Sequence, residues 1–271
     1  MSIKSHIVCS FSEELIRELE KLNVDPKREL DPLSGEPYLV FDIPDLKDSS
    51  ILPEDAVVIE SPYYTEAELD GAEWLKCRCL NAKISLTNEE RSFCLEEVYD
   101  NGKKAQHRYP SGAPFYIGAA PKHRNTQAFF SSYSLSEYDL FCTERAKQVI
   151  SDCFPDIDAS FEPVLSSKDD LPIGDLYFLD IRTALEMNSI DLSGVSKFRC
   201  PECGKESFVE PMQLSIHAEP SSAAVKTPRC FSCGGSLEYS ILIVSQRFRR
   251  ALIDHGLARG LVFEPVVLSI V

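Results

Sequence analysis

The sequence predicts an α+β protein with mixed sheets, in which one strand-helix-strand unit is duplicated and a small cysteine-bearing ribbon is inserted. Three observations predict this class. Short strand-like runs alternate with a few amphipathic helical stretches. A segment of the chain recurs at an offset of 102, and two Cys-x-x-Cys-Gly motifs lie between its two copies. At 271 residues the chain is long enough for two domains, which we place at 1–130 and 131–271.

The N-terminal domain is expected to be an acidic α+β domain. An amphipathic helix is predicted over 12–22, because Leu15, Ile16 and Leu19 fall on one stripe at helical spacing. Strand-like runs follow at 38–43, 56–60 and 74–80. Residues 87–90 have the form of a capping box and predict a short helix. Residues 101–125 predict a loop around one strand near 115–117.

The C-terminal domain is predicted from the repeat, which aligns 134–164 with 236–266 without gaps. Both copies contain Ser-Leu at the start and Phe-Glu-Pro-Val at the end. Thr143 and Ser245 occupy matching positions before a helix, as N-cap residues do. We therefore expect two strand-helix-strand units. They either form two equivalent binding surfaces or, as we favour, build a shared sheet by duplication.

The two cysteine motifs are typical of a closed zinc site. Each places two thiols around a tight turn, and a glycine after the second cysteine tolerates a positive φ. A redox pair or a disulfide pair are the alternatives. We predict one structural zinc ion in a small ribbon at 198–235, inserted before the last unit and held by Cys200, Cys203, Cys230 and Cys233. The other six cysteines are expected to be small buried hydrophobes: Cys9, Cys77, Cys79, Cys94, Cys142 and Cys153.

The net charge of −15 argues against binding to nucleic acid, because it would repel phosphates. It is concentrated before Ser196, since the rest of the chain has 9 basic and 7 acidic residues. An acidic surface either suits a basic protein partner or only keeps the chain soluble. The residues we select for partner binding are Asp42, Asp45, Asp48, Glu54, Asp55, Glu66, Glu68 and Asp70.

No pattern in the sequence predicts catalysis. There is no nucleophile elbow, phosphate-binding loop or dinucleotide-binding glycine motif. The segment 175–180 contains an aspartate at each end, but it is better interpreted as a strand with aromatic core residues. His255 occupies the apolar stripe of the second helix, which favours a packed or helix-end histidine. The sequence has no export signal and no run long enough to span a membrane, so we expect a cytoplasmic protein that is not an enzyme.

Both cysteine motifs and the tail at 243–266 resemble the double-CXXCG immunity proteins of bacterial toxin–immunity systems. The tail is similar to the closing segment of that family, in which a Ser-x-Arg-Phe helix precedes Gly-Leu and a strand ending in Pro-Val. Residues 175–181 and the Arg-Thr-Ala-Leu-Glu that follows resemble a related immunity family without the cysteine motifs. The resemblance covers about 134–271. One departure is that both motifs lie in the C-terminal third, whereas the first often lies nearer the N-terminus in the family.

The resemblance implies a cytoplasmic protein that binds and neutralises a cognate toxin, with zinc on the four cysteines. No shared motif specifies the residues that contact the toxin. The alternative is a zinc-ribbon protein that binds nucleic acid or regulates another protein. The oligomeric state is not predicted.

Overall fold

A computed structural model describes residues 2–21, 24, 26–30, 37–42, 53, 55–80, 83–87, 93–100, 103–110, 114–121, 125–199, 206–232 and 238–269. The chain is mixed α+β, with several mixed sheets and few helices. It divides into two compact units, Met1–Glu66 and Ala67–Val271. This division differs from the expected boundary at residue 130, because strand β5 (Trp74–Cys79) pairs with two strands from the end of the chain.

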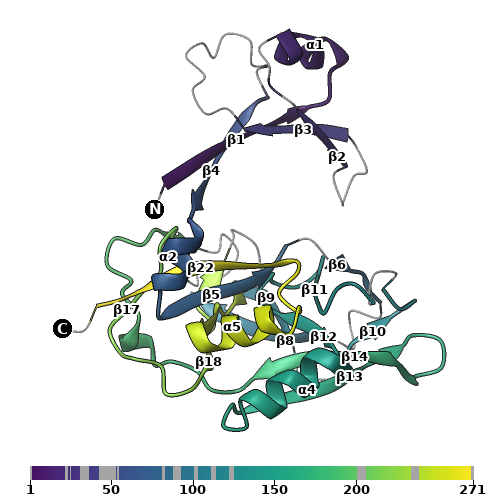
Figure 1. Cartoon of the computed structure of the whole chain (residues 1–271), viewed down its shortest axis with the longest axis vertical. Helices are drawn as coiled ribbons and strands as arrows, with labels where there is room; N and C mark the ends of the chain where they lie inside the picture. The colour runs from purple at the N-terminus through teal and green to yellow at the C-terminus, as the bar shows by residue number, and fades with distance from the viewer. Residues whose placement is uncertain are drawn as a thin grey trace. The chain divides into compact units, whose positions relative to one another are not determined.

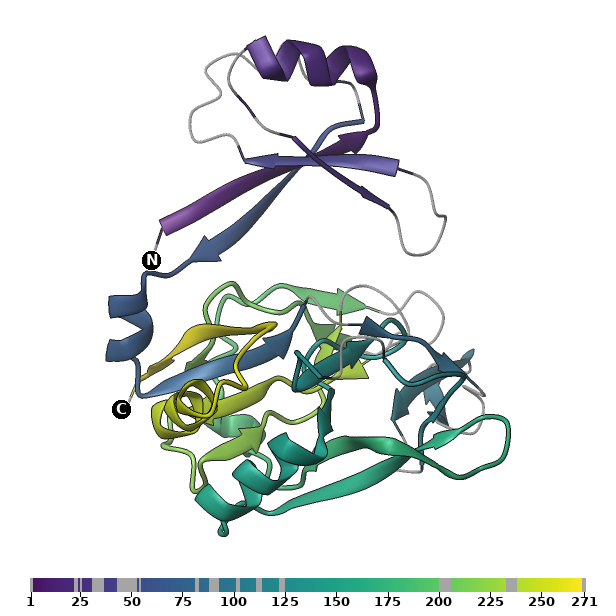
Figure 2. The same ribbon diagram turned by 45° about the vertical axis from the view of Figure 1, so that its right-hand side comes forward.

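In the described residues, the N-terminal unit forms a four-stranded antiparallel sheet and one helix. Its order is β2-β3-β1-β4, and α1 (Glu13–Lys21) lies across one face (Figure 2). The helix buries Leu15 and Leu19 against Ile7, Cys9 and Leu39 of the sheet. The predicted helix and the first two predicted strands are confirmed within two or three residues at each end. The strands are β1 (Ser2–Ser10), β2 (Lys27–Leu30), β3 (Pro37–Asp42) and β4 (Val57–Tyr63).

The larger unit contains a seven-stranded sheet of order β6-β11-β12-β14-β13-β10-β7. Helix α4 (Glu144–Cys153) connects β12 to β13, and β14 lies between these two strands, antiparallel to both (Figure 1). The strands are β6 (Lys83–Ile84), β7 (Leu86–Thr87), β10 (Tyr116–Ile117), β11 (Phe129–Ser132), β12 (Leu140–Thr143), β13 (Ala159–Ser166) and β14 (Pro172–Ile181).

A five-stranded sheet in the same unit has the order β17-β22-β5-β21-β18. Helix α5 (Gln246–Asp254) connects β21 to β22, and β5 lies between these strands, antiparallel to both. The strands other than β5 are β17 (Ser215–Ile216), β18 (Ala224–Lys226), β21 (Leu242–Ser245) and β22 (Leu261–Leu268).

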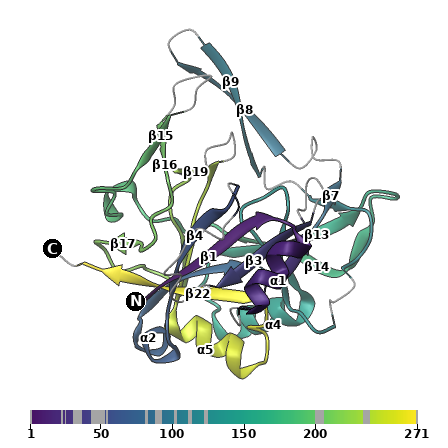
Figure 3. The ribbon, with the colours of Figure 1, turned by 90° about the horizontal axis from the view of Figure 1, so that it is seen from above.

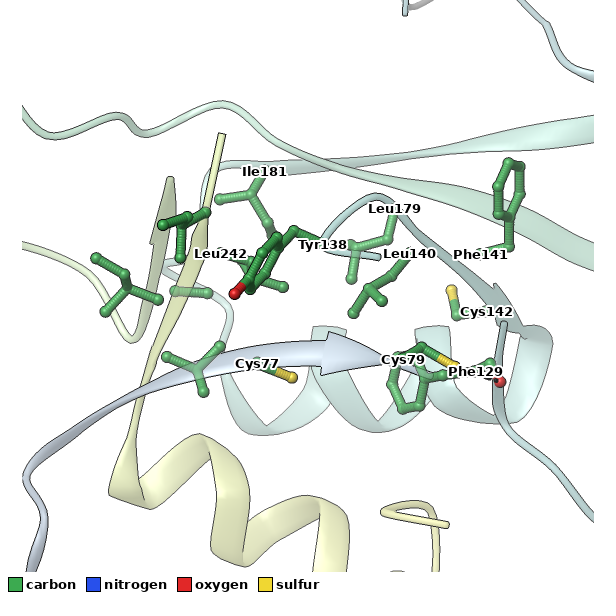
Figure 4. Packing of buried hydrophobic residues seen from close by; sticks show 14 of the residues in the cluster. Cys77, Cys79, Phe129, Tyr138, Leu140, Phe141, Cys142, Leu179, Ile181 and Leu242 are labelled. Atoms are coloured by element: carbon green, nitrogen blue, oxygen red, sulfur yellow. Dashed lines mark hydrogen bonds between the residues drawn. The ribbon is translucent and has the colours of Figure 1, made fainter. Parts of the chain in front are cut away.

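The two sheets share one hydrophobic core, but they are separate sheets. The expectation that the segments 134–164 and 236–266 build one shared sheet is therefore wrong, because β12 and β13 lie in one sheet and β21 and β22 in the other. Figure 4 shows Cys77 and Cys79 of β5 beside Phe129, Leu140 and Leu179 of the seven-stranded sheet, all of them buried. Burial of apolar area at about 25 cal/mol per Å² makes such a shared core the main stabilising contribution. Of the cysteines predicted to be buried, Cys77, Cys79 and Cys142 are buried in this core and Cys9 is buried in the N-terminal unit. Cys153 is half-buried.

The helix termini follow their sequence signals in part. The Ser245 hydroxyl accepts a hydrogen bond of 3.2 Å from the Phe248 amide, as an N-cap does. Thr143 has the extended N-cap backbone, but its side chain makes no capping bond. Gly256 has φ +67°, the left-handed conformation that ends a helix and suits glycine.

Two further sheets, a short helix and a 3₁₀ turn complete the described residues. The hairpin β8 (Phe93–Asp100) and β9 (Lys103–Pro110) projects from the larger unit (Figure 3). The sequence predicted a loop with one strand at 101–125, and this is wrong in part because β9 is a second strand there. The predicted strand near 115–117 is confirmed by β10 (Tyr116–Ile117). The helix α2 (Glu66–Gly71) precedes β5, and a 3₁₀ turn spans Met187–Ser189. The short helix predicted from the capping box at 87–90 is not tested, because residues 88–90 lie outside the described residues. No helix in the described ranges is long and apolar enough to cross a membrane.

Candidate metal centre and partner-binding residues

The segments that carry the two cysteine motifs converge in one small sheet of order β15-β16-β19-β20. β15 (Lys197–Arg199) and β16 (Glu206–Phe208) flank the first motif, while β19 (Phe231–Ser232) lies between the two cysteines of the second motif and β20 (Glu238–Tyr239) follows it. The central strands β16 and β19 pair in parallel. Residues 200–205 and 233–237 lie outside the described residues, so three of the four predicted ligands, Cys200, Cys203 and Cys233, are not placed.

Cys230 is the predicted ligand that the structure describes. Its side chain is buried, and its carbonyl oxygen accepts a hydrogen bond of 2.8 Å from the Phe208 amide on β16. Burial, and then the nearby Glu238 carboxylate, raise the pKa of the Cys230 thiol to about 12. A metal ion would reverse this preference, because it binds the thiolate. Within the described residues there is no cluster of three or more His, Cys, Asp or Glu side chains that could hold a metal.

The acidic residues selected for partner binding are divided between the two units. Asp42 is on β3, while Asp45, Asp48 and Glu54 lie outside the described residues. Asp55 is exposed and accepts hydrogen bonds from the amide and the hydroxyl of Ser10, which lower the pKa of its carboxyl. Glu66, Glu68 and Asp70 are exposed on α2.

Asp70 differs from the other acidic residues because it pairs with a buried cation. Its Oδ1 lies 2.6 Å from Nη1 of Arg249, whose side chain on α5 is 4% exposed. A buried guanidinium needs such a partner, because an unpaired buried charge is costly. Asp70 therefore has a structural role that its sequence position did not indicate.

The segment 175–180 is part of β14, as expected. Leu176 and Phe178 are buried, and Tyr177 is half-buried, with Lys147 Nζ lying 4.1 Å from the centre of its ring. Asp180 lies 3.4 Å from Lys226 Nζ. An odd spacing of five residues along a strand places Asp175 and Asp180 on opposite faces, so they do not form a carboxylate pair.

The sequence did not reveal an ionic cluster formed by Lys76, Arg78, Glu210 and Glu264, in which Lys76 and Glu264 are buried and Arg78 and Glu210 are half-buried. Lys76 lies on the central strand β5 with its side chain 2% exposed. It pairs with Glu264 of β22, and Arg78 Nη2 lies 2.5 Å from the same carboxylate. The residues are far apart in the chain, and the only signal was a lysine within the apolar strand 74–80.

Glu210 connects this cluster to the cysteine-bearing sheet. It follows β16, and its Oε1 lies 3.0 Å from Lys76 Nζ. The Tyr138 hydroxyl donates to the same oxygen, and the Tyr239 hydroxyl donates to Oε2 over 3.1 Å. Burial and the Glu210 carboxylate raise the pKa of Tyr138 well above its usual value. One carboxylate thus connects β5, β20 and the turn that precedes β12.

Among the cavities formed by the described residues of the larger unit, two bear on the candidate sites. A crevice of about 540 Å³ lies between α4 and α5, lined by Cys153, Phe154, Arg247 and Arg250 among others. A second cleft of about 370 Å³ is lined by Asp139, Asp180, Lys226 and Arg229 among others. Burial raises the pKa of Asp139, against the opposing effects of Lys226 and Arg229. Both cavities mix cationic and anionic side chains.

His255 is a helix-end histidine. It is the C-cap residue of α5, and its Nδ1 lies 2.9 Å from the Ala251 carbonyl oxygen. Because His255 is exposed, it is not packed in the core, and of the two expected roles it has that of a helix-end residue.

No protein-family model matches the chain, and no curated protein matches it.

Proposed function

We propose that this protein is an immunity protein, which binds a cognate bacterial toxin in the cytoplasm and neutralises it by occlusion rather than by catalysis. The observation that carries the proposal is the combination of two Cys-x-x-Cys-Gly motifs with the tail at 243–266. The structure of the tail further supports the proposal, because the tail forms β21, α5 and β22, and these two strands pair with β5 on either side. The segment that carries the resemblance is therefore part of the scaffold.

In this proposal the segments 134–164 and 236–266 are copies of one strand-helix-strand unit. The order of elements supports the duplication, since β12, α4 and β13 correspond to β21, α5 and β22. In each unit an antiparallel strand lies between the two parallel strands. Duplication would serve the architecture, because each copy covers a sheet with one helix.

The four motif cysteines would hold one structural zinc ion in a ribbon. Convergence of β15, β16, β19 and β20 in one sheet supports this, as does the Phe208–Cys230 hydrogen bond between the two hairpins. Four thiolates leave no open coordination position, so zinc would stabilise the fold and would not activate a substrate.

Metal analysis of the purified chain tests the zinc site. We expect about one zinc per chain, and loss of zinc with a lower melting temperature in Cys200→Ser and Cys230→Ser. Cys153→Ser is the matched control, because Cys153 lies outside the motifs and is half-buried. Protein prepared without chelator that holds no zinc would refute the site.

The toxin contact is proposed on the acidic residues, and the partner would be basic. Among the described ones, Asp55, Glu66 and Glu68 are exposed, whereas Asp70 pairs with Arg249. Opposite charge on the toxin would speed association more than it would tighten the complex. An acidic surface could also mimic the phosphates bound by a nuclease toxin.

Co-expression with the product of the adjacent gene tests the function. We expect the two proteins to copurify and this chain to rescue growth. The triple variant Asp55→Lys, Glu66→Lys, Glu68→Lys should slow association and weaken its salt dependence. Asp156→Lys with Glu186→Lys is the control, since both residues are exposed acids that are not among those selected for partner binding. No copurification and no rescue with the wild-type chain would refute the function.

The second candidate function is a zinc-ribbon protein that binds nucleic acid or has a regulatory role. It is kept because such ribbons often contact DNA or RNA. It predicts salt-dependent retention on a polyanion column. The net charge of −15 opposes it, and an unretained chain would reject it.

A further inference from the structure

The two large sheets of the Ala67–Val271 unit have the same strand order and the same strand directions. Five strands of one, β11-β12-β14-β13-β10, correspond to β18-β21-β5-β22-β17 of the other. In both series the first three pairings are antiparallel and the last is parallel. The likeness extends to the outer strands, because isolated bridges at Ala184 and Ile190 take the positions of β6 and β7.

The registers of the two sheets also agree residue by residue. Phe141 pairs with Phe178, and Ile243 pairs with Lys76. Phe161 pairs with Leu179, and Phe263 pairs with Cys77. In each case the residue numbers of equivalent positions differ by 102. The offset holds in the two ladders beside the central strand, whereas the outer strands β18 and β17 follow β11 and β10 at offsets of 95 and 99. Register is set separately in each ladder by side-chain burial, so agreement in both central ladders is not expected from two unrelated sheets.

Chain order shows where the equivalence begins. β5 precedes β6 and β7 as β14 precedes the bridges at Ala184 and Ile190. The numbering offset matches Trp74 of β5 with Leu176 of β14. The two halves are therefore 74–166 and 176–268, three times longer than the repeat visible in the sequence.

The first strand of each half lies in the sheet of the other half. β14 belongs to the second half and lies between β12 and β13 of the first. β5 belongs to the first half and lies between β21 and β22 of the second. We infer that 74–166 and 176–268 are two copies of one fold that have exchanged their first strands, which interlocks them within a single chain.

The interlock is a conformational device. Neither half completes its sheet without the other, because the exchanged strand is central and buried on both sides. The halves therefore separate only when a central strand is withdrawn, as in swapped dimers. This inference does not depend on toxin binding or on zinc.

Hydrogen exchange on two matched variants tests the exchange. Leu75 of β5 and Leu179 of β14 are both buried leucines. Leu75→Ala should speed exchange roughly tenfold or more in β21 and β22, and less in β12 and β13. Leu179→Ala should have the opposite pattern. Faster exchange in β12 and β13 for Leu75→Ala, or equal effects on both sheets, would overturn the inference.

Cleavage of the chain gives a second measurement if either variant fails to fold. A protease site inserted at 167–171, in the turn between β13 and β14, cuts between the halves where Leu171 is 61% exposed. The two fragments of the otherwise unchanged protein should elute together in native buffer and separate only in denaturant. Fragments that part in native buffer would overturn the interlock.

Discussion

The guanidinium of Arg145, at the start of α4, donates a hydrogen bond of 2.6 Å to the backbone carbonyl of His255, at the end of α5. The reverse contact joins Arg247 of α5 to the carbonyl of Cys153 over 3.2 Å. Arg145 and Arg247 occupy equivalent positions of the repeat, as do Cys153 and His255. The helices therefore run antiparallel, and each arginine satisfies a carbonyl at the other helix's end.

Removal of these arginines should destabilise the helix pair. Arg145→Ala and Arg247→Ala should each cost about 0.5–1.5 kcal/mol, because each loses a charged hydrogen bond at a helix C-terminus. Urea unfolding measures the loss. Arg250→Ala, on the same helix as Arg247 and exposed, is the control and should change stability by less than about 0.5 kcal/mol. Equal losses in all three variants would show that the contacts contribute nothing specific.

Breaking the ionic cluster should have a larger effect. Glu264→Ala leaves Lys76 without its nearest carboxylate inside the core, which should cost about 3–5 kcal/mol. Thermal and urea unfolding measure it. Glu206→Ala removes a pair with Lys197 whose side chains are more than half exposed, and should cost no more than about 1 kcal/mol. A small effect of Glu264→Ala would mean that Glu210 alone keeps Lys76 paired.

Gly260 should not tolerate a side chain. Its φ is +82°, and a Cβ there would lie 2.1 Å from Nε2 of Gln127. Gly260→Ala should therefore cost about 1–3 kcal/mol from backbone strain, with a steric contribution added. Combining it with Gln127→Ala should recover only the steric part. Gly71→Ala is the control, because a Cβ there meets nothing within 4 Å. Full recovery in the double variant would contradict a role for the backbone.

The pH dependence of stability should report Asp139. Burial raises the pKa of this carboxyl, so the folded chain binds its proton more tightly than the unfolded chain does. Stability from this group is present at low pH and is lost as pH rises from the unfolded pKa to the raised folded pKa. Asp139→Asn should therefore gain stability relative to wild type between about pH 4 and pH 7. Urea unfolding at pH 4 and at pH 7 measures the free energy of unfolding of both proteins. If Asp139→Asn became less stable relative to wild type as the pH rises, the assigned sign would be wrong.

Local sequence patterns predicted the elements well where one face is buried. The stripe of Leu15 and Leu19 predicted α1, and the N-cap position of Ser245 predicted the start of α5. The β8–β9 hairpin was missed because its strands carry many charged residues and little alternation. The compact units divide at Glu66 and not at the expected residue 130, because β5 pairs with strands 167 to 192 residues further along the chain.

Some features of the candidate sites could likewise be predicted from local sequence, and others could not. The cysteine motifs were visible because metal-ligand spacing is local, and the acidic residues were visible as composition. The sequence did not show that Asp70 pairs with Arg249 or that Glu210 contacts Lys76, because each contact joins residues from separate elements. Burial decides which charged groups need partners, and burial follows from packing.

The sequence by itself determined the α+β class, the cysteine motifs, and the repeat from 134 and 236 onward, because these depend on residue types at short spacing. Only the tertiary structure decided that β5 lies between β21 and β22 and that β14 lies between β12 and β13, the pairings from which we infer an equivalence that extends back to Trp74 and Leu176. Equivalent strands share a register and a depth of burial without sharing residues. Long-range pairing is therefore determined by the packing of the whole core and cannot be seen in any short window of sequence.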